Sequence, residues 1–133
     1  HNPDGARSLA SHLKANPLDA PITSVLFGAM KDKDIPHIIA PIHHVLGTRV
    51  RWFPVCIDNE RAASAHTLTR LLSDAGIDFT GPDTCQLQCA RAARGGDTIL
   101  IFGSLYLLGE VLNEVGVSPH ELVCWADSFA DTV

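Results

Sequence analysis

Residues 97–112, DTILIFGSLYLLGEVL, carry the clearest fold signal in the sequence. The strongly apolar run TILIF at 98–102 is typical of a central strand in a parallel sheet. Gly103-Ser104 then predicts a turn, and residues 105–115 predict a helix that Gly116 ends. A buried strand that turns directly into a helix indicates an α/β protein.

The same alternation continues on the amino-terminal side of this stretch. Further strands are predicted at 24–29 (SVLFGA), at 50–56 (VRWFPVC) and, more briefly, at 78–80. Pro54 restricts the second of these to a sheet edge or a strand end. Pro41 is expected to kink or split the helix that Asp34 caps. The other helices are predicted from Asn2-Pro3 to Asn16-Pro17, over 61–75 with Gly76 as the stop, and over 84–94, whereas 118–133 is ambiguous.

Length and composition indicate one domain. A chain of 133 residues with 46% hydrophobic and 19% charged residues has the balance of a globular protein. Strands that alternate with helices imply right-handed β-α-β units. We therefore expect an α/β fold over residues 1–133, a Rossmann-like three-layer α/β/α arrangement with a mostly parallel sheet.

Charge and hydropathy argue against two classes of partner. The formal net charge is −5 and no stripe of Lys and Arg is present, so binding to nucleic acid is not expected. The apolar run 98–108 is too short to span a membrane and no signal peptide is visible, so a cytoplasmic location without membrane contact is expected. The chain begins with His1 instead of Met, which indicates a fragment, a processed product or an incomplete sequence.

The cysteines predict no metal centre. Cys56, Cys85, Cys89 and Cys124 form no CxxC pair of the kind that zinc sites use. We expect them to be small buried residues with free thiols in a reducing compartment. The sequence also lacks the GxGxxG motif of dinucleotide-binding folds and the GxxxxGK[ST] motif of a P-loop.

Three junctions between a strand and a helix are candidate binding sites, because ligands of parallel α/β sheets bind beyond the strand carboxyl ends, where helix amino ends attract anions. At Gly103-Ser104 the serine could bind a carboxylate or phosphate, or could only cap the helix. Segment 27–34 (FGAMKDKD) could contact a nucleotide or another domain, or could be solvated surface. His1 could position a reacting group if a strand preceded it, or could be a disordered end. We expect all three junctions to meet at one edge of the sheet.

Four segments, in order, resemble motifs of the folylpolyglutamate and dihydrofolate synthases. HNPDGA at 1–6 resembles their D-x-A-H-N-P-x-A motif, and FGAMKDKD at 27–34 resembles F-G-x-M-x-D-K-D. NERAAS at 59–64 is similar to N-P-R-A-x-S, with Glu60 where Pro is usual. Residues 97–112 resemble G-D-x-x-L-V-F-G-S-F-Y-x-V-G-E-x-L. Together the four segments cover most of the chain.

The resemblance implies the carboxy-terminal glutamate-ligase domain, of the Mur ligase type, of a larger two-domain enzyme. In that family an amino-terminal P-loop domain binds most of the ATP and magnesium, so no cofactor is expected on this chain alone. ATP phosphorylates the carboxylate of dihydropteroate or of a folate glutamate tail, and L-glutamate then attacks the acyl phosphate. The implied roles are in folate biosynthesis and polyglutamylation.

The resemblance also implies roles for single residues. His1 matches a histidine beside the incoming glutamate and would be catalytic and glutamate-binding, and Ser104 matches a serine that contacts the same glutamate. The family aspartate that holds the ATP ribose would lie three residues before His1, outside the chain. A role in nucleotide or interdomain contact is implied for Lys31, Asp32, Lys33 and Asp34.

The alternative is a stand-alone Rossmann-like module for small-molecule binding or regulation. A GxxxxGK[ST] motif upstream in the gene would favour the ligase, whereas a start codon just before His1 would favour the module. As a ligase domain, the chain alone is expected to fold without turning over substrate.

Overall fold

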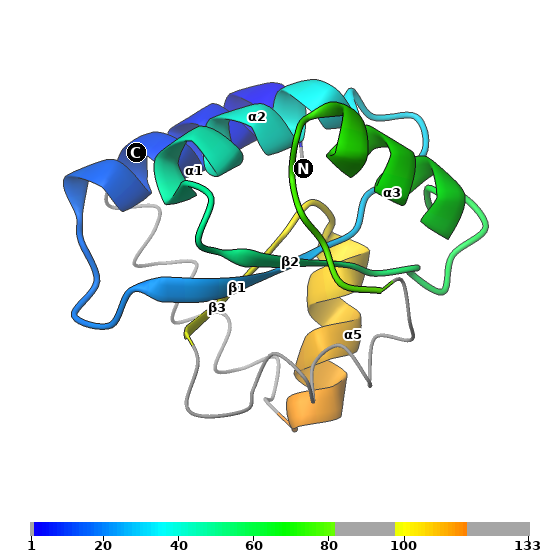
Figure 1. The fold of residues 1–133 in the computed structure, drawn as a ribbon. Coiled ribbons are helices and arrows are strands. Elements are labelled where there is room, and N and C mark those ends of the chain that lie inside the picture. Colours follow the sequence, from blue (N-terminus) through cyan, green and yellow to red (C-terminus); the bar gives the residue numbers. More distant parts are fainter. Residues whose placement is uncertain (1, 82–97, 117–133) are drawn as a thin grey trace.

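The computed structural model describes residues 2–81 and 98–116, which alternate helices with strands (Figure 1). The elements in chain order are α1 (Pro3–Ala15), β1 (Ile22–Phe27), α2 (Ile35–Leu46), β2 (Arg51–Pro54), α3 (Ala65–Asp74), β3 (Thr98–Phe102) and α5 (Leu105–Val115). Several expectations fall outside the described residues: those for His1, the helix at 84–94, segment 118–133, Cys85, Cys89 and Cys124.

The described strands form one parallel sheet in the order β2-β1-β3. Leu26 of β1 aligns with Phe53 of β2 and with Ile101 of β3, so all of these strands end at the same edge. Helices α1, α2 and α3 cover one face of the sheet and α5 covers the other (Figure 1). The expected α/β fold with three layers and a parallel sheet is therefore confirmed.

The alternation of side chains along β1 divides the apolar core between the two faces. Val25 and Phe27 belong to the core beneath α1, α2 and α3. Leu26, which lies between them in sequence, belongs to the core beneath α5 with Phe53 and Leu107. Because successive strand residues point to opposite faces, a strand that is covered on both sides is typically apolar on both faces. This explains the continuous apolar run at the end of β1.

Helix α2 continues through Pro41 as one element, so of the two predicted outcomes the split is wrong, and the kink stays a prediction. A proline inside a helix removes one hydrogen bond and costs about 3 kcal/mol. Burial of an isoleucine side chain contributes roughly 1.5–3 kcal/mol, and α2 buries four of them. The burial outweighs the proline and keeps the helix intact; the four residues are Ile35, Ile38, Ile39 and Ile42.

Helix α3 begins at Ala65 instead of Arg61. The Ser64 Oγ accepts a hydrogen bond from the Thr67 N–H at 3.1 Å and caps the helix there. Upstream, the Asn59 Oδ1 accepts from the Arg61 N–H at 2.8 Å and holds the preceding residues in a turn. The helix ends before Gly76, whose φ of 73° fits the predicted stop.

The strands differ from prediction at their ends. β1 spans Ile22–Phe27, so it starts and ends earlier than the predicted 24–29. Among the described strands β1 lies between β2 and β3. Residues 78–80 form a single bridge, Phe79 to Trp52, instead of a strand. Pro54 is the last residue of β2, as predicted.

Cys56 is exposed and free, so the expectation that it is buried is wrong. Its neighbours Val55 and Ile57 are both buried, at 0% and 5% exposure. In an extended segment, alternate side chains point to opposite sides, which turns Cys56 toward solvent.

At the edge of the sheet where the strands begin, the connection between α1 and β1 is exposed to solvent. Residues 16–21, between α1 and β1, are exposed at every position and lie at this amino edge (Figure 1). Leu18 in this segment is 53% exposed. None of the described helices is long and apolar enough to cross a membrane.

Candidate functional site

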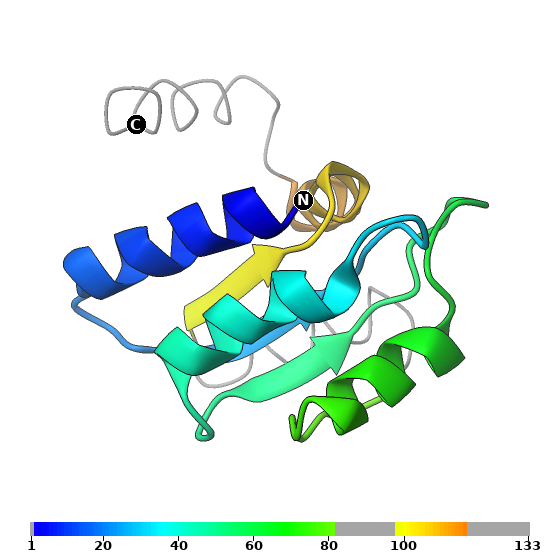
Figure 2. The same ribbon diagram turned by 90° about the horizontal axis from the view of Figure 1, so that it is seen from above.

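The carboxyl edge of the sheet gathers the junctions that the sequence singled out. Helices α1, α2 and α5 all begin at this edge, where the parallel strands end (Figure 2). Phe27, the last residue of β1, aligns with Phe102, the last residue of β3. The predicted convergence is therefore confirmed for segment 28–34 and Gly103-Ser104, whereas His1 lies outside the described residues.

Gly103 and Gly28 are in close contact at the centre of this edge. A Cβ added to Gly103 would lie 2.3 Å from the Gly28 carbonyl oxygen, and Gly103 has a φ of 111°. A Cβ added to Gly28 would lie 2.9 Å from the Val55 carbonyl oxygen. Only glycine fits such close approaches, so two glycines bring the three post-strand segments into contact.

Ser104 is the N-cap of α5. Its Oγ accepts a hydrogen bond from the Tyr106 N–H at 3.1 Å, and the residue is 8% exposed. The hydroxyl hydrogen is not used by this bond, so the group can still donate to an anion. Leu105 and Tyr106, at 70% and 55% exposure, flank it with apolar surface.

Segment 31–34 is anchored through its backbone. The Lys31 N–H donates to the Arg61 carbonyl oxygen at 2.8 Å, and the Lys33 N–H donates to that of Met30 at 3.2 Å. The Asp32 carboxylate lies 3.5 Å from the Arg61 guanidinium, and both side chains are more than half exposed. The backbone is therefore held in place, while the side chains of Lys31, Asp32 and Asp34 are exposed.

Asp34 precedes α2 but makes no side-chain cap, contrary to the prediction. Its carboxylate lies 2.8 Å from the Nδ1 of His37, one turn into the helix. The hydrogen bond from His37 holds the pKa of Asp34 below its ordinary value of 3.8. The Asp34 carboxylate therefore binds a side chain of the same helix instead of the free backbone N–H groups at the start of that helix.

Two residues to which the sequence reasoning gave no role take part in this edge. Arg61 contacts both the backbone and the side chains of segment 31–34. Glu110 of α5 accepts a hydrogen bond from the Asp58 N–H at 2.7 Å. Arg61 lies in the motif NERAAS and Glu110 in the closing GEVL, both quoted above. A motif does not show which residues of other elements its members contact in the fold.

The amino end of α1 follows the sequence prediction. The Asn2 Oδ1 accepts from the Gly5 N–H at 2.7 Å, and Pro3 occupies the first turn. Helix α1 begins at the carboxyl edge of the sheet (Figure 2).

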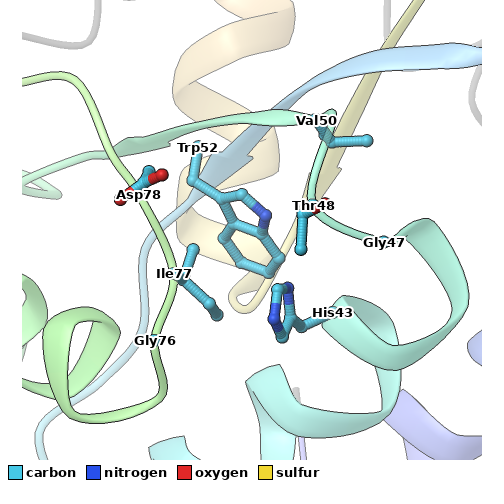
Figure 3. A pocket seen from close by; sticks show the side chains of 8 residues that line it. All are labelled: His43, Gly47, Thr48, Val50, Trp52, Gly76, Ile77 and Asp78. Atoms are coloured by element: carbon cyan, nitrogen blue, oxygen red, sulfur yellow. The ribbon is translucent and has the colours of Figure 1, made fainter.

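A small pocket of about 30 Å³ lies at the opposite, amino edge (Figure 3). His43, Thr48 and Asp78 line it, and the Trp52 indole forms one wall. The His43 Nδ1 and the Trp52 Nε1 are buried and have no hydrogen-bond partner among the described residues. None of the predicted site residues lines this pocket, so it is separate from the candidate site. Among the described residues, no group of three or more His, Cys, Asp or Glu side chains could hold a metal ion.

Several solved structures resemble the chain over most of its length. Escherichia coli FolC in complex with DHPP and ADP aligns with a TM-score of 0.71 at 25% identity, covering 87% of this chain and 27% of that one. A bifunctional folylpolyglutamate synthase/dihydrofolate synthase from Yersinia pestis, complexed with AMPPNP and Mn ion, aligns at 0.68 with 26% identity and the same coverage.

The Mycobacterium tuberculosis folylpolyglutamate synthase complexed with ADP shares the fold, with a TM-score of 0.69 at 21% identity over 90% of this chain and 29% of that one. The chain therefore spans less than a third of the length of each of these structures. Searches against family profiles and against curated protein sequences found no match.

Proposed function

Because the chain resembles one domain of the folylpolyglutamate and dihydrofolate synthases in both motifs and fold, we propose that it is the carboxy-terminal domain of an ATP-dependent ligase that adds L-glutamate to dihydropteroate or to folate. The resemblance to FolC supports the fold and the ligase class. The substrates, the cytoplasmic location and the amino-terminal P-loop domain as partner are part of the proposal.

The carboxyl edge of the sheet is the proposed glutamate-side wall of the active site. In the reaction, the glutamate nitrogen bonds to the acyl carbon, the bond from that carbon to the phosphate oxygen breaks, and the nitrogen loses a proton. In this proposal Ser104 orients a glutamate carboxylate and His1 lies beside the amino group. The positive end of α5 adds a field that favours the carboxylate.

The observation that carries the proposal is the contact between Gly28 and Gly103. It brings two of the matched motifs, at 27–34 and 97–112, to one edge, although they are far apart in sequence. Here they meet where parallel α/β sheets bind ligands.

Segment 31–34 is the proposed contact to the nucleotide or to the amino-terminal domain. Its backbone bond to Arg61 fixes it while Lys31, Asp32 and Asp34 remain exposed. ATP and magnesium would be held mainly by the amino-terminal domain, and no step through them is assigned to these residues.

The kinetic test uses the full-length enzyme with Ser104→Ala. Loss of one hydrogen bond to a charged group is worth roughly 1.5–3 kcal/mol, so the glutamate KM should rise about tenfold to a hundredfold while the ATP KM changes little. Ser64→Ala is the matched control, because Ser64 caps α3 with a similar bond of 3.1 Å. Unchanged glutamate kinetics in Ser104→Ala, or an equal change in Ser64→Ala, would reduce Ser104 to a helix cap.

A second test uses the 133-residue chain alone. It should fold but show no turnover, because its sequence has no P-loop motif. Phosphate release from ATP, with folate and glutamate present, is the measurement. Release above background by the pure chain contradicts the proposal.

A further inference from the structure

Glu110 is a half-buried carboxylate on α5 that the proposed mechanism does not use. We propose that it is a positioning residue that holds loop 58–61, and through it segment 31–34, in a fixed place relative to Ser104. This inference rests on the proposed function, because it links the two surfaces that the function assigns to different parts of the substrate complex.

The first link is the bond between α5 and the loop. The Glu110 Oε1 accepts from the Asp58 N–H at 2.7 Å, a short bond of the charge-assisted kind. Glu110 lies on the same helix as Ser104, which caps its first turn. A displacement of α5 that moves Ser104 would therefore also pull on Asp58.

The second link is inside the loop. The Asn59 N–H donates to the Ile57 carbonyl oxygen at 2.8 Å, and the Asn59 Oδ1 accepts from the Arg61 N–H at 2.8 Å. Two consecutive tight turns therefore fix the position of Arg61 relative to that of Asp58. Neither turn spans more than a few residues, so the loop has little freedom to absorb a shift.

The third link joins the loop to the segment that follows β1. The Arg61 carbonyl oxygen accepts from the Lys31 N–H at 2.8 Å, and Met30 pairs with Ala62 in an antiparallel bridge. The Ala63 N–H donates to the Ala29 carbonyl oxygen at 2.8 Å. The charged residues of segment 31–34 are thus placed by the same loop that Glu110 holds.

Removal of the Glu110 carboxylate should leave the fold intact. Ile57 packs in the core beneath α5 together with Leu107 and Val111, so apolar contact still docks the helix on the loop. Alanine is also a good helix former. The expected result is a loosened loop on an otherwise native domain.

The structural experiment is hydrogen exchange by mass spectrometry on the full-length protein. In Glu110→Ala, peptides that cover 57–63 and 28–34 should exchange about tenfold to a hundredfold faster, whereas the peptide of β1 should keep its protection. Glu110→Gln retains an acceptor oxygen and should restore most of the protection. Glu114→Ala changes an exposed carboxylate on the same helix and should change neither peptide.

The kinetic experiment separates positioning from binding. Glu110→Ala should raise the KM for both glutamate and ATP about threefold to tenfold, and Glu110→Gln should rescue it, whereas Ser104→Ala affects glutamate alone. The inference is overturned if Glu110→Ala leaves the exchange rate of 57–63 unchanged. It is also overturned if exchange becomes faster at 57–63 but not at 28–34. Either result holds even when the wild-type protein is an active ligase. An inactive wild-type protein with the expected exchange pattern would instead refute the proposed function and leave the link in place.

Discussion

The two edges of the sheet both use glycine, but for different reasons. At the amino edge, Gly47 and Gly76 have φ values of 77° and 73°, and a Cβ on either would meet no atom of the described part of the chain within 4 Å. At the carboxyl edge, a Cβ on Gly103 or Gly28 would run into a backbone carbonyl oxygen of another segment. Glycine therefore serves chain reversal at one edge and contact between segments at the other, which is the edge where we propose the reaction.

The largest expected effect is that of Gly103→Ala. Its backbone conformation disfavours a side chain, and the Cβ would overlap the Gly28 carbonyl oxygen. Strain and overpacking together should cost on the order of 3–5 kcal/mol of unfolding free energy. Urea unfolding followed by circular dichroism measures this.

Gly109→Ala is the control on α5, where a Cβ meets nothing within 4 Å, and it should be neutral or stabilising. A loss below about 1 kcal/mol for Gly103→Ala would show that the edge is not tightly packed.

Gly28→Ala should have the next largest effect. Its Cβ would lie 2.9 Å from the Val55 carbonyl oxygen and 3.0 Å from two carbons of Ile57. The φ of Gly28 is not positive, so only crowding contributes, and we expect a loss of about 1–3 kcal/mol. The double variant Gly28→Ala/Ile57→Val tests the cause, because a smaller side chain at 57 should recover part of the loss. No recovery would place the crowding on the Val55 backbone alone.

Gly76→Ala, at the amino edge, should cost only about 1 kcal/mol, since the penalty comes from positive φ without a clash. The same urea titration applies. A loss equal to that of Gly103→Ala would remove the contrast between the two edges.

The smallest expected effect concerns pH. The His37 side chain lowers the pKa of Asp34, so the stability that this pair adds is present above pH 3.8 and is lost as the pH falls through the lowered pKa. In His37→Ala the pKa of Asp34 should return toward 3.8, as an NMR titration of the carboxyl carbon would show. His44→Ala, on an exposed position of the same helix, should leave it unchanged. A low pKa that persists without His37 would assign the shift to another cause.

Much of the fold follows from the sequence because its signals are local. The apolar run of β3, the turn at Gly103-Ser104 and the stop at Gly116 were predicted in place. The misses have two causes. Burial outweighs a local rule in α2, where four buried isoleucines keep the helix whole despite Pro41. In α3 one local signal outweighs another, because the cap at Ser64 sets the start of the helix.

The site was predictable in its location but not in its contacts. Parallel strands place their carboxyl ends at one edge, so the meeting of Gly28 and Gly103 follows from topology. The bond from Asp58 to Glu110 joins residues from different elements, and no spacing rule within one element reveals it. Likewise, the Asp34 carboxylate pairs with His37 instead of capping α2, and the sequence alone does not show which of these two local interactions is stronger.

The exposed connection 16–21 is a suitable site for inserting sequence into this domain. It lies at the amino edge, away from the carboxyl edge, and all six of its residues face solvent (Figure 1). Exposed connections of this kind accept inserted sequence well. A fluorescent label or an affinity peptide inserted after Leu18 would report on this domain without disturbing the contact between Gly28 and Gly103 at the carboxyl edge.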